Sequence, residues 1–346
     1  MNALTECRTT TVTPRGVASP KMVDATPAIA PVFAELERHR RELTGYCYRM
    51  LGSPSEAEDA VQETLLNAWR GMDGFQGRAA LRTWLYRIAT NVCLNMLKSS
   101  QRRALPTDLT SPASADAPIG EPLPAAAWVE PIPDSRVLSE TSDPAELAAS
   151  RESIRLAFVA ALQRLPARQR AVLILRDVLN WHAAETAELL GTTVAAVNSA
   201  LERARATVGA EDTGDPFRPL DQQQQVLLRR YVDAFERFDL DALTSLLHLD
   251  ATLSMTPFRH WLRGPDEMRR WYEGQGSGCR GSKLCPLLAN GTPAFGQYRP
   301  GGKPWALHVV QTSAGLITAI HSFVDTQRLF PLFGLPLQAN AQSVSV

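Results

Sequence analysis

The sequence has few of the features that mark secreted, membrane-spanning or zinc-binding proteins. Only five of its 346 residues are cysteines, and none forms a CxxC pair or a Cys/His cluster with zinc spacing. This odd, scattered set predicts reduced thiols, no bound metal and a cytoplasmic location. Residues 1–32 contain no apolar run of the signal-peptide kind. No stretch approaches the ~18 consecutive apolar residues that a membrane helix needs, so no membrane partner is expected.

A net charge of one sign is also lacking. The 36 basic and 36 acidic residues cancel, which excludes a uniformly basic nucleic-acid-binding surface. The charges are nevertheless segregated, because residues 33–103 and 151–208 each have three more basic than acidic residues, whereas residues 104–150 hold one basic and eight acidic residues. Residues 104–150 also contain eight prolines. This composition predicts an extended, disordered tether between two basic helical regions.

The first basic region has helical periodicity. Ser53-Pro54-Ser55-Glu56 matches a capping box and predicts a helix that begins at Pro54, after a preceding helix that ends at Gly52. Apolar side chains recur at helical spacing as far as Trp69, with polar side chains on the opposite face. A second amphipathic helix is expected within Arg82–Arg103, which contains five basic residues and no acid.

The most specific pattern lies between His182 and Arg205. A helix-turn-helix needs a small residue where two helices touch, a glycine in the turn and a buried aliphatic residue in the second helix. Ala187, Gly191 and Val197 have the expected spacings of four and six residues. The pattern predicts a DNA-reading helix, although an ordinary helical hairpin satisfies it too. The expected outward face comprises Thr192, Thr193, Ala195, Ala196, Asn198, Ser199, Glu202, Arg203 and Arg205.

The last third of the chain mixes helical and strand patterns. Helical periodicity from Val226 to Leu247 is followed by strand-like runs between Trp305 and Val324, which predicts an α+β domain. Alternation along the last run places His321 and Asp325 on one face, as a side-by-side pair. No nucleophile motif or phosphate-binding glycine loop accompanies them, so neither catalysis nor a cofactor is expected. The candidate pocket residues are Trp261, His308, His321 and Asp325.

Three motifs in a fixed order give the chain a family resemblance. DAVQETLLNAW (Asp59–Trp69), RTWLYRIATNVCLNMLKSSQRR (Arg82–Arg103) and LPARQRAVLILRDV (Leu165–Val178) resemble segments of bacterial sigma factors. Over residues 29–208 the chain is identified as a member of the extracytoplasmic-function (ECF) group of sigma-70 factors, and its last third is similar to SnoaL-like domains. The resemblance implies a multidomain protein: two all-α domains joined by an extended linker, followed by an α+β cone of the NTF2-like kind.

The resemblance also sets the expected boundaries. They are a disordered segment (1–28), sigma domain 2 (29–103), an acidic proline-rich linker (104–150), sigma domain 4 with the helix-turn-helix (151–208), a second linker (209–221), the SnoaL-like domain (222–332) and a tail (333–346).

Residue roles follow from the same resemblance. Contacts to core RNA polymerase, at its β′ clamp, would come from Asp59, Ala60, Val61, Gln62, Glu63 and Asn67, although the residues alone suggest a solvated helix face. The minus-ten promoter element would be bound by Arg82, Trp84, Tyr86, Arg87, Asn91, Lys98, Arg102 and Arg103, with Trp84 equally compatible with a core position.

The remaining implications concern partners and the linker. The second helix of the helix-turn-helix would read the minus-thirty-five element. The acidic linker would mimic nascent RNA in the exit path of polymerase, a plain flexible tether being the alternative. The β flap is a further expected contact, and an anti-sigma factor is left open as a partner.

Three functions remain at this stage. The first is an alternative sigma factor that directs transcription initiation, with a C-terminal domain that modulates its activity. The second is an NTF2-like small-molecule enzyme or sensor with an accessory DNA-binding module. The third is a stand-alone helix-turn-helix repressor, for which neither a dimerisation heptad nor a use for the DAVQET helix is evident.

Overall fold

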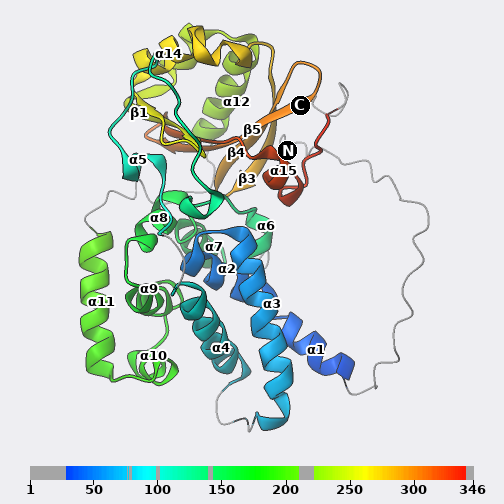
Figure 1. Ribbon diagram of the computed structural model, residues 1–346, viewed down its shortest axis with the longest axis vertical. Helices are drawn as coiled ribbons and strands as arrows, with labels where there is room; N and C mark the ends of the chain where they lie inside the picture. Colours follow the sequence, from blue (N-terminus) through cyan, green and yellow to red (C-terminus); the bar gives the residue numbers. More distant parts are fainter. Residues whose placement is uncertain are drawn as a thin grey trace, which may run out of the picture.

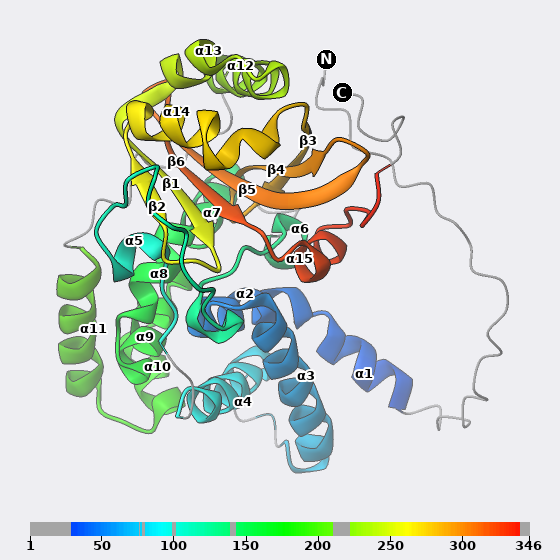
Figure 2. The same cartoon turned by 45° about the horizontal axis from the view of Figure 1, so that its top comes forward.

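The computed structural model of the protein describes residues 29–75, 77, 80–98, 102–138, 143–209 and 222–339. Two helical parts lie together below a mixed α/β part (Figures 1 and 2). We name four parts: the N-terminal helical unit (29–98), the connecting segment (102–138), the central helical unit (143–209) and the C-terminal unit (222–339). The expected disordered segment 1–28, most of the second linker and the end of the tail lie outside the described residues. None of the described helices is long and apolar enough to cross a membrane.

The N-terminal helical unit contains the helices that the periodicity predicts. Gly52 closes its second helix in the left-handed conformation, and the third begins at Pro54. The capping box does not form, because the Ser53 hydroxyl donates to Glu130 and the Glu56 carboxylate accepts from Arg103. Trp69 is 44% exposed, so its expected place on the buried face is wrong. The helices are α1 (Ile29–Glu37), α2 (Arg40–Leu51), α3 (Pro54–Gly71) and α4 (Leu81–Met96), with a 3-10 turn η1 (Met72–Gly74).

The connecting segment differs from the extended tether that its composition predicts. Trp128, Val129 and Ile132 are almost completely buried in it. The Val129 amide donates to the Ala104 carbonyl, and the Leu123 amide donates to the Pro257 carbonyl of the C-terminal unit. Its apolar residues therefore order it by packing against the other units rather than in a core of its own. Its short helices are α5 (Pro106–Leu109), η2 (Ala125–Ala127) and α6 (Asp134–Val137).

The central helical unit ends in a helix-turn-helix. Pro166 separates two of its helices, and a π-helical turn follows the second. Gly191 has a φ of 61° in the turn before the last helix, a backbone conformation that favours glycine. The elements are α7 (Pro144–Glu152), α8 (Leu156–Gln163), α9 (Ala167–Leu173), the π-helical turn η3 (Ile174–Val178), α10 (Ala183–Leu190) and α11 (Val194–Val208).

The C-terminal unit is one curved sheet with helices against it (Figure 2). The strand order is β2-β1-β6-β5-β4-β3; β1 and β6 are parallel and the other neighbours antiparallel. The strands are β1 (Leu247–Thr256), β2 (Trp261–Arg263), β3 (Lys283–Ala289), β4 (Thr292–Arg299), β5 (Lys303–Ser313) and β6 (Leu316–Phe323). The helices are α12 (Gln222–Arg237), α13 (Leu240–Ser245), α14 (Pro265–Glu273), η4 (Gln275–Cys279) and α15 (Thr326–Leu332).

The two faces of this sheet belong to different hydrophobic cores. Phe295 and Val310 face a core with α12, α13 and α14. Leu307 and Val309 face the opposite way, into a core that continues through α15, the connecting segment and both helical units. Apolar burial is the main stabilising force in folding. The C-terminal unit is therefore joined to the helical units by a shared core.

Candidate nucleic-acid and polymerase interface

The helix-turn-helix has its predicted buried and exposed residues. Ala187 and Val197 are buried where α10 and α11 touch, and Leu201 continues the buried stripe of α11. Thr193 caps α11, because its hydroxyl accepts from the Ala196 amide at 3.1 Å. Arg205 pairs with Asp177 through two hydrogen bonds. The residues expected to face DNA are all exposed: Thr192, Thr193, Ala195, Ala196, Asn198, Ser199, Glu202, Arg203 and Arg205.

Helix α4 and the residues that follow it present only part of the expected minus-ten set to solvent. Tyr86 is completely buried and Arg103 nearly so, and Arg103 donates to the carbonyls of Ala125 and Trp128 in the connecting segment. The family resemblance assigned Arg103 to the minus-ten element and gave no sign that it binds the connecting segment. Trp84 is half-buried and lies 4.9 Å, ring to ring, from Phe75. The exposed members are Arg82, Asn91, Lys98 and Arg102, with Arg87 partly covered.

The central helical unit covers this same part of α4. The Trp181 ring lies 5.2 Å from the Tyr86 ring, and the Arg82 guanidinium lies 5.7 Å from the Trp181 ring centre. Arg87 pairs with Glu188 of α10 at 3.1 Å. The unit that carries the helix-turn-helix is therefore docked on the helix expected to bind the minus-ten element.

Helix α3 keeps its polar face open. Asp59, Gln62 and Glu63 are exposed and Asn67 is half-buried. Ala60 and Val61, also expected in the polymerase contact, are buried in the core of the N-terminal helical unit. Only the polar members of the expected set can reach a partner directly.

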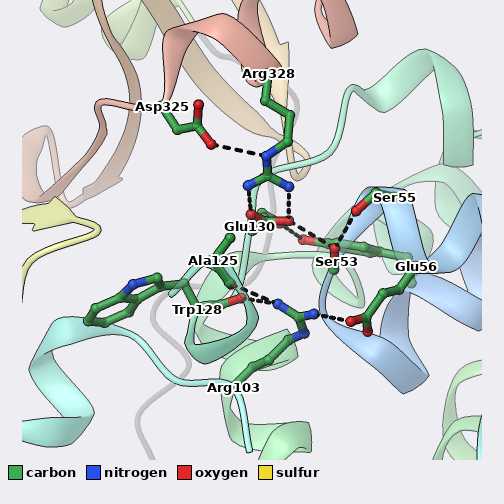
Figure 3. A network of polar contacts seen from close by, with 10 residues as sticks. Ser53, Ser55, Glu56, Arg103, Ala125, Trp128, Glu130, Asp325 and Arg328 are labelled. Carbon is green, nitrogen blue, oxygen red and sulfur yellow. Dashed lines mark hydrogen bonds and ion pairs between the residues drawn. The ribbon is translucent and has the colours of Figure 1, made fainter. Parts of the chain in front are cut away.

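Glu130 links the connecting segment to two other units (Figure 3). Its side chain is 4% exposed and accepts hydrogen bonds from Ser53 at 2.9 Å and from both terminal nitrogens of Arg328 in α15. Arg328 also pairs with Asp325 at 3.0 Å. Burial lowers the pKa of Arg328, and the positive charge of Arg103 adds to this effect. Removing either side chain leaves the other charge without its main partner, so we expect the loss of either one to destabilise the contact between these units.

Asn290, in the turn between β3 and β4, makes a second link. Its amide nitrogen donates to the Tyr48 hydroxyl at 2.7 Å and to the Ile154 carbonyl at 2.6 Å, and its amide oxygen accepts from Ile132 at 2.9 Å. One buried side chain thus contacts all three other parts of the molecule. The next residue, Gly291, donates its amide to Asp134 at 2.8 Å. Burial raises the pKa of Asp134 to about 6.

The four candidate pocket residues do not form one site. His308 and His321 lie on opposite faces of the sheet, because His321 is paired across the strands with Val309, the residue next to His308. His308 faces the aromatic core near Phe235. Its Nε2 donates to Gln297 at 2.8 Å, and its Nδ1 accepts from Ser322 at 3.0 Å. Burial lowers its pKa to about 4, so it is neutral at pH 7.

The other three pocket candidates lie on the side of the connecting segment. His321 is hydrogen-bonded to Ser254 at 3.0 Å, and burial lowers its pKa to about 4. Trp261 donates to the Thr110 carbonyl at 2.9 Å. Asp325 is paired with Arg328, so the expected His321–Asp325 pair is wrong: the strand ends at Phe323 and the chain turns into α15. A cavity of about 300 Å³ lies here, between Trp128, Phe323 and Arg328.

The sequence reading missed Glu130, Arg328 and Asn290. The Asn290-Gly291 pair did carry a signal, since this dipeptide between two strand-like runs favours a two-residue hairpin turn. Both residues have positive φ, as such a turn requires. Nothing in the sequence alone connected Glu130 with Arg328, 198 residues later.

Comparisons with known proteins agree with this arrangement. The family profile of Sigma-70 region 2 matches residues 36–103, that of Sigma-70 region 4 matches residues 155–208, and that of a SnoaL-like domain matches residues 228–314. The helix-turn-helix lies inside the second match and the sheet largely inside the third.

Two relatives from Mycobacterium tuberculosis span most of the chain. The ECF RNA polymerase sigma factor SigG is 46% identical over 313 residues, which cover 88% of this chain and 83% of SigG. The ECF sigma factor SigJ is 30% identical over 282 residues, covering 78% of this chain and 82% of SigJ. The crystal structure of SigJ superposes with a TM-score of 0.59 at 25% identity, over 88% of this chain and 99% of SigJ. The chain therefore belongs to the ECF family of RNA polymerase sigma factors, which direct transcription initiation at promoters, and it carries a SnoaL-like domain at its C-terminal end.

Proposed function

We propose that this sigma factor rests in a compact form that is unable to bind a promoter and that opens when core RNA polymerase is bound. In the open form, the exposed face of α3 would bind the β′ clamp, α4 would bind the minus-ten element and α11 would read the minus-thirty-five element. The β flap would hold the central helical unit. The 3.1 Å contact between Arg87 of α4 and Glu188 of α10 is the observation that carries this proposal.

Distance is the reason why the compact form cannot serve both promoter elements. Elements centred near −10 and −35 are about 25 base pairs apart, or roughly 85 Å along B-DNA at 3.4 Å per base pair. Helices that touch one another cannot lie on both elements at once. The central helical unit must therefore leave α4 before both elements are read.

The C-terminal unit would set the balance between the two forms. It shares a core with both helical units and holds the connecting segment through Arg328 and Asn290. An ordered, buried connecting segment cannot at the same time extend through the RNA exit path, so that role would belong to the open form. A built-in domain of this kind would take the place of a separate anti-sigma factor.

The test is run-off transcription from a fragmented genomic library with purified core polymerase and the full chain. We expect discrete transcripts that depend on the protein, and severalfold more product with Arg328→Ala or Glu130→Gln, because both changes weaken the contact by which the C-terminal unit holds the connecting segment and so favours the compact form. Arg237→Ala is the matched control, since it breaks an exposed ion pair with Asp233 inside α12. Absence of any transcript would contradict the proposed function. Equal output from the three variants and the unmodified chain would contradict the regulatory role of the C-terminal unit.

A further inference from the structure

A polar groove of about 1050 Å³ lies against α2, and Gln62 of α3 and Arg82 and Tyr86 of α4 are among its lining residues. The connecting segment contributes α6, the central helical unit contributes α7, and α3 and α4 complete the wall. Figure 1 shows α6 and α7 beside α2. The groove is lined by six arginines and four glutamates, so its charge balance is positive.

Arg49 supplies the feature that points to a ligand. Its side chain is 5% exposed and forms no ion pair with any described carboxylate. Nε and Nη2 donate to the carbonyl and hydroxyl of Ser153, whereas Nη1 has no hydrogen-bond partner among the described residues. Nη1 is not one of the fully buried atoms that lack a partner, so part of its surface remains accessible. Since Arg49 lines the groove, this accessible nitrogen is open to it. A buried charge without a counter-charge is costly, and a bound anion would offset that cost.

The helix positions a second free guanidinium in line with the first. Arg41, Gly45 and Arg49 are spaced by four residues and therefore form one row along α2. Arg41 is exposed and has no ion-pair partner among the described residues. The Cα atoms of Arg41 and Arg49 are about 12 Å apart at 1.5 Å per residue, and side chains on a helix lean toward its N-terminus. Arg49 thus extends over Gly45 toward Arg41.

Gly45 keeps the floor of the groove open. A Cβ atom at this position would lie 3.0 Å from Nη1 of Arg49. Glycine in the middle of a helix costs about 1 kcal/mol relative to alanine. Glycine at position 45 therefore lowers the stability of the helix but leaves room for the guanidinium group of Arg49.

The other charged groups of the groove are mostly paired with each other. Arg40 pairs with Glu37 and Glu58, Arg82 pairs with Glu42, and Arg136 lies 3.5 Å from Glu58. Glu146 of α7 is the one lining carboxylate for which the described residues provide no ion pair. Arg38, the sixth lining arginine, pairs with Glu35. The unpaired groups are thus two guanidinium groups and one carboxylate.

We propose that this groove binds a small anion with two linked phosphate groups, one held by Arg41 and the other by Arg49. Guanidinium groups donate to phosphate oxygens in a planar, charge-assisted geometry, and two of them in a row match two consecutive phosphates. Two directly joined phosphates occur in free diphosphate compounds. Consecutive phosphates separated by one sugar occur in the backbone of single-stranded nucleic acid. The cavity exceeds what a diphosphate alone requires, which leaves room for an attached group.

Binding would also favour the compact form. The groove has walls from three units, so it is complete only while α6 and α7 lie against α2. A ligand that binds one form alone stabilises it in proportion to the logarithm of its concentration. This consequence rests on the proposed function, whereas binding itself is measured without polymerase and fails or succeeds independently.

The experiment is calorimetric titration of the full chain with inorganic pyrophosphate, in buffer free of phosphate and magnesium. We expect saturable binding to one site, about tenfold weaker in Arg41→Ala, since one charge-assisted hydrogen bond is worth about a factor of ten or more. Gly45→Ala should also weaken binding while leaving thermal stability unchanged or higher, which separates loss of the site from loss of folding. Arg230→Ala removes an exposed arginine from α12 and should bind normally.

A parallel titration with a five-nucleotide single-stranded DNA distinguishes the two sources of phosphate. If the oligonucleotide binds with the same sensitivity to Arg41→Ala and Gly45→Ala while pyrophosphate binds less tightly, the site recognises a nucleic-acid backbone. No saturable binding of either probe would overturn the proposal. So would binding that is equally tight in both variants and in the unmodified chain.

Discussion

Tyr48 and Asn290 are 242 residues apart in the chain and share a buried hydrogen bond of 2.7 Å. The Tyr48 hydroxyl accepts this bond and donates its own proton to the Glu130 carbonyl at 2.7 Å. Tyr48 belongs to α2, Glu130 to the connecting segment and Asn290 to the C-terminal unit. One hydroxyl group therefore joins three of the four parts of the molecule. Burial raises the pKa of Tyr48 above its ordinary value, so the hydroxyl keeps its proton at any physiological pH.

Replacing Tyr48 by phenylalanine should loosen this junction. The change leaves the Glu130 carbonyl without its donor and removes one acceptor of Asn290, which we expect to cost about 1–3 kcal/mol of the free energy of unfolding. Urea unfolding followed by tryptophan fluorescence measures this loss. Hydrogen exchange at the β3–β4 turn should become faster as well.

Tyr46→Phe provides the matched control for this prediction. The Tyr46 hydroxyl is also buried, but its partner is Thr90 within the N-terminal helical unit. This variant should lose a similar free energy of unfolding without faster exchange at Asn290 and Gly291. Equal exchange at the turn in both variants would show that the Tyr48 contact does not hold the units together.

The buried Asp134 should make the junction sensitive to pH. Burial raises its pKa from 3.8 to about 6, against the lowering effects of the Gly291 amide and of Arg151. Because the folded state holds this proton more tightly than the unfolded state, the group's contribution to stability is most favourable below about pH 4. It decreases by up to about 3 kcal/mol as the pH rises through 6.

Asp134→Asn tests this effect, since the amide carries no charge at any pH. We expect the variant to be more stable than the unmodified chain at pH 7.5 and to lose that advantage at pH 4.5. Asp143→Asn is a suitable control, because Asp143 is exposed. Thermal unfolding at the two pH values is sufficient. The same difference in stability at both would show that Asp134 does not titrate in this range.

Local features of the fold could be predicted because short-range chemistry determines them. Gly52 ends a helix and Gly191 occupies the turn of the helix-turn-helix, both as the sequence indicates, and both have the left-handed conformation. The buried stripe of α11 follows directly from its 3.6-residue period. These features depend on residues within a few positions of one another.

The contacts between units could not be predicted in this way. The eight acids and eight prolines of residues 104–150 suggested disorder, yet Trp128 and Ile132 are buried because other units supply the apolar surface around them. Ser53 matched a capping box, yet its hydroxyl donates to Glu130, 77 residues later. Composition and local pattern describe what a segment can bury by itself, and they are silent about surfaces that distant segments provide.

The proposed DNA-reading role of α11 leads to a prediction about two exposed side chains. Asn198→Ala and Arg203→Ala should each reduce transcription from promoters that depend on the minus-thirty-five element. Loss of a base-edge contact costs about 1–3 kcal/mol, or roughly five- to 150-fold. Stability should change by less than about 0.5 kcal/mol, as is usual for exposed positions. Run-off transcription on intact and scrambled minus-thirty-five sequences measures the effect.

A residue near the end of the same helix serves as the control. Thr207 is exposed, and its hydroxyl donates a hydrogen bond to the Arg203 carbonyl at 3.0 Å, within the same helix. Thr207→Ala should leave promoter output unchanged. If Asn198→Ala and Arg203→Ala reduce output equally from the scrambled sequence, the two side chains do not read bases at this element.

The exposed polar face of α3 gives the most direct test of polymerase binding. Asp59 and Glu63 are four residues apart and exposed, so they lie on the same side of the helix. The double variant Asp59→Asn, Glu63→Gln keeps the shape of both side chains and removes two charges. We expect at least about tenfold weaker binding to core RNA polymerase, since interface contacts of charged groups are worth about 1.4 kcal/mol or more.

Asp73→Asn, in the exposed turn η1 after α3, should bind normally. Binding is measured by fluorescence anisotropy of the labelled full chain. Unchanged affinity in the double variant would place the polymerase contact elsewhere on the N-terminal helical unit, because neither substitution disturbs its buried core.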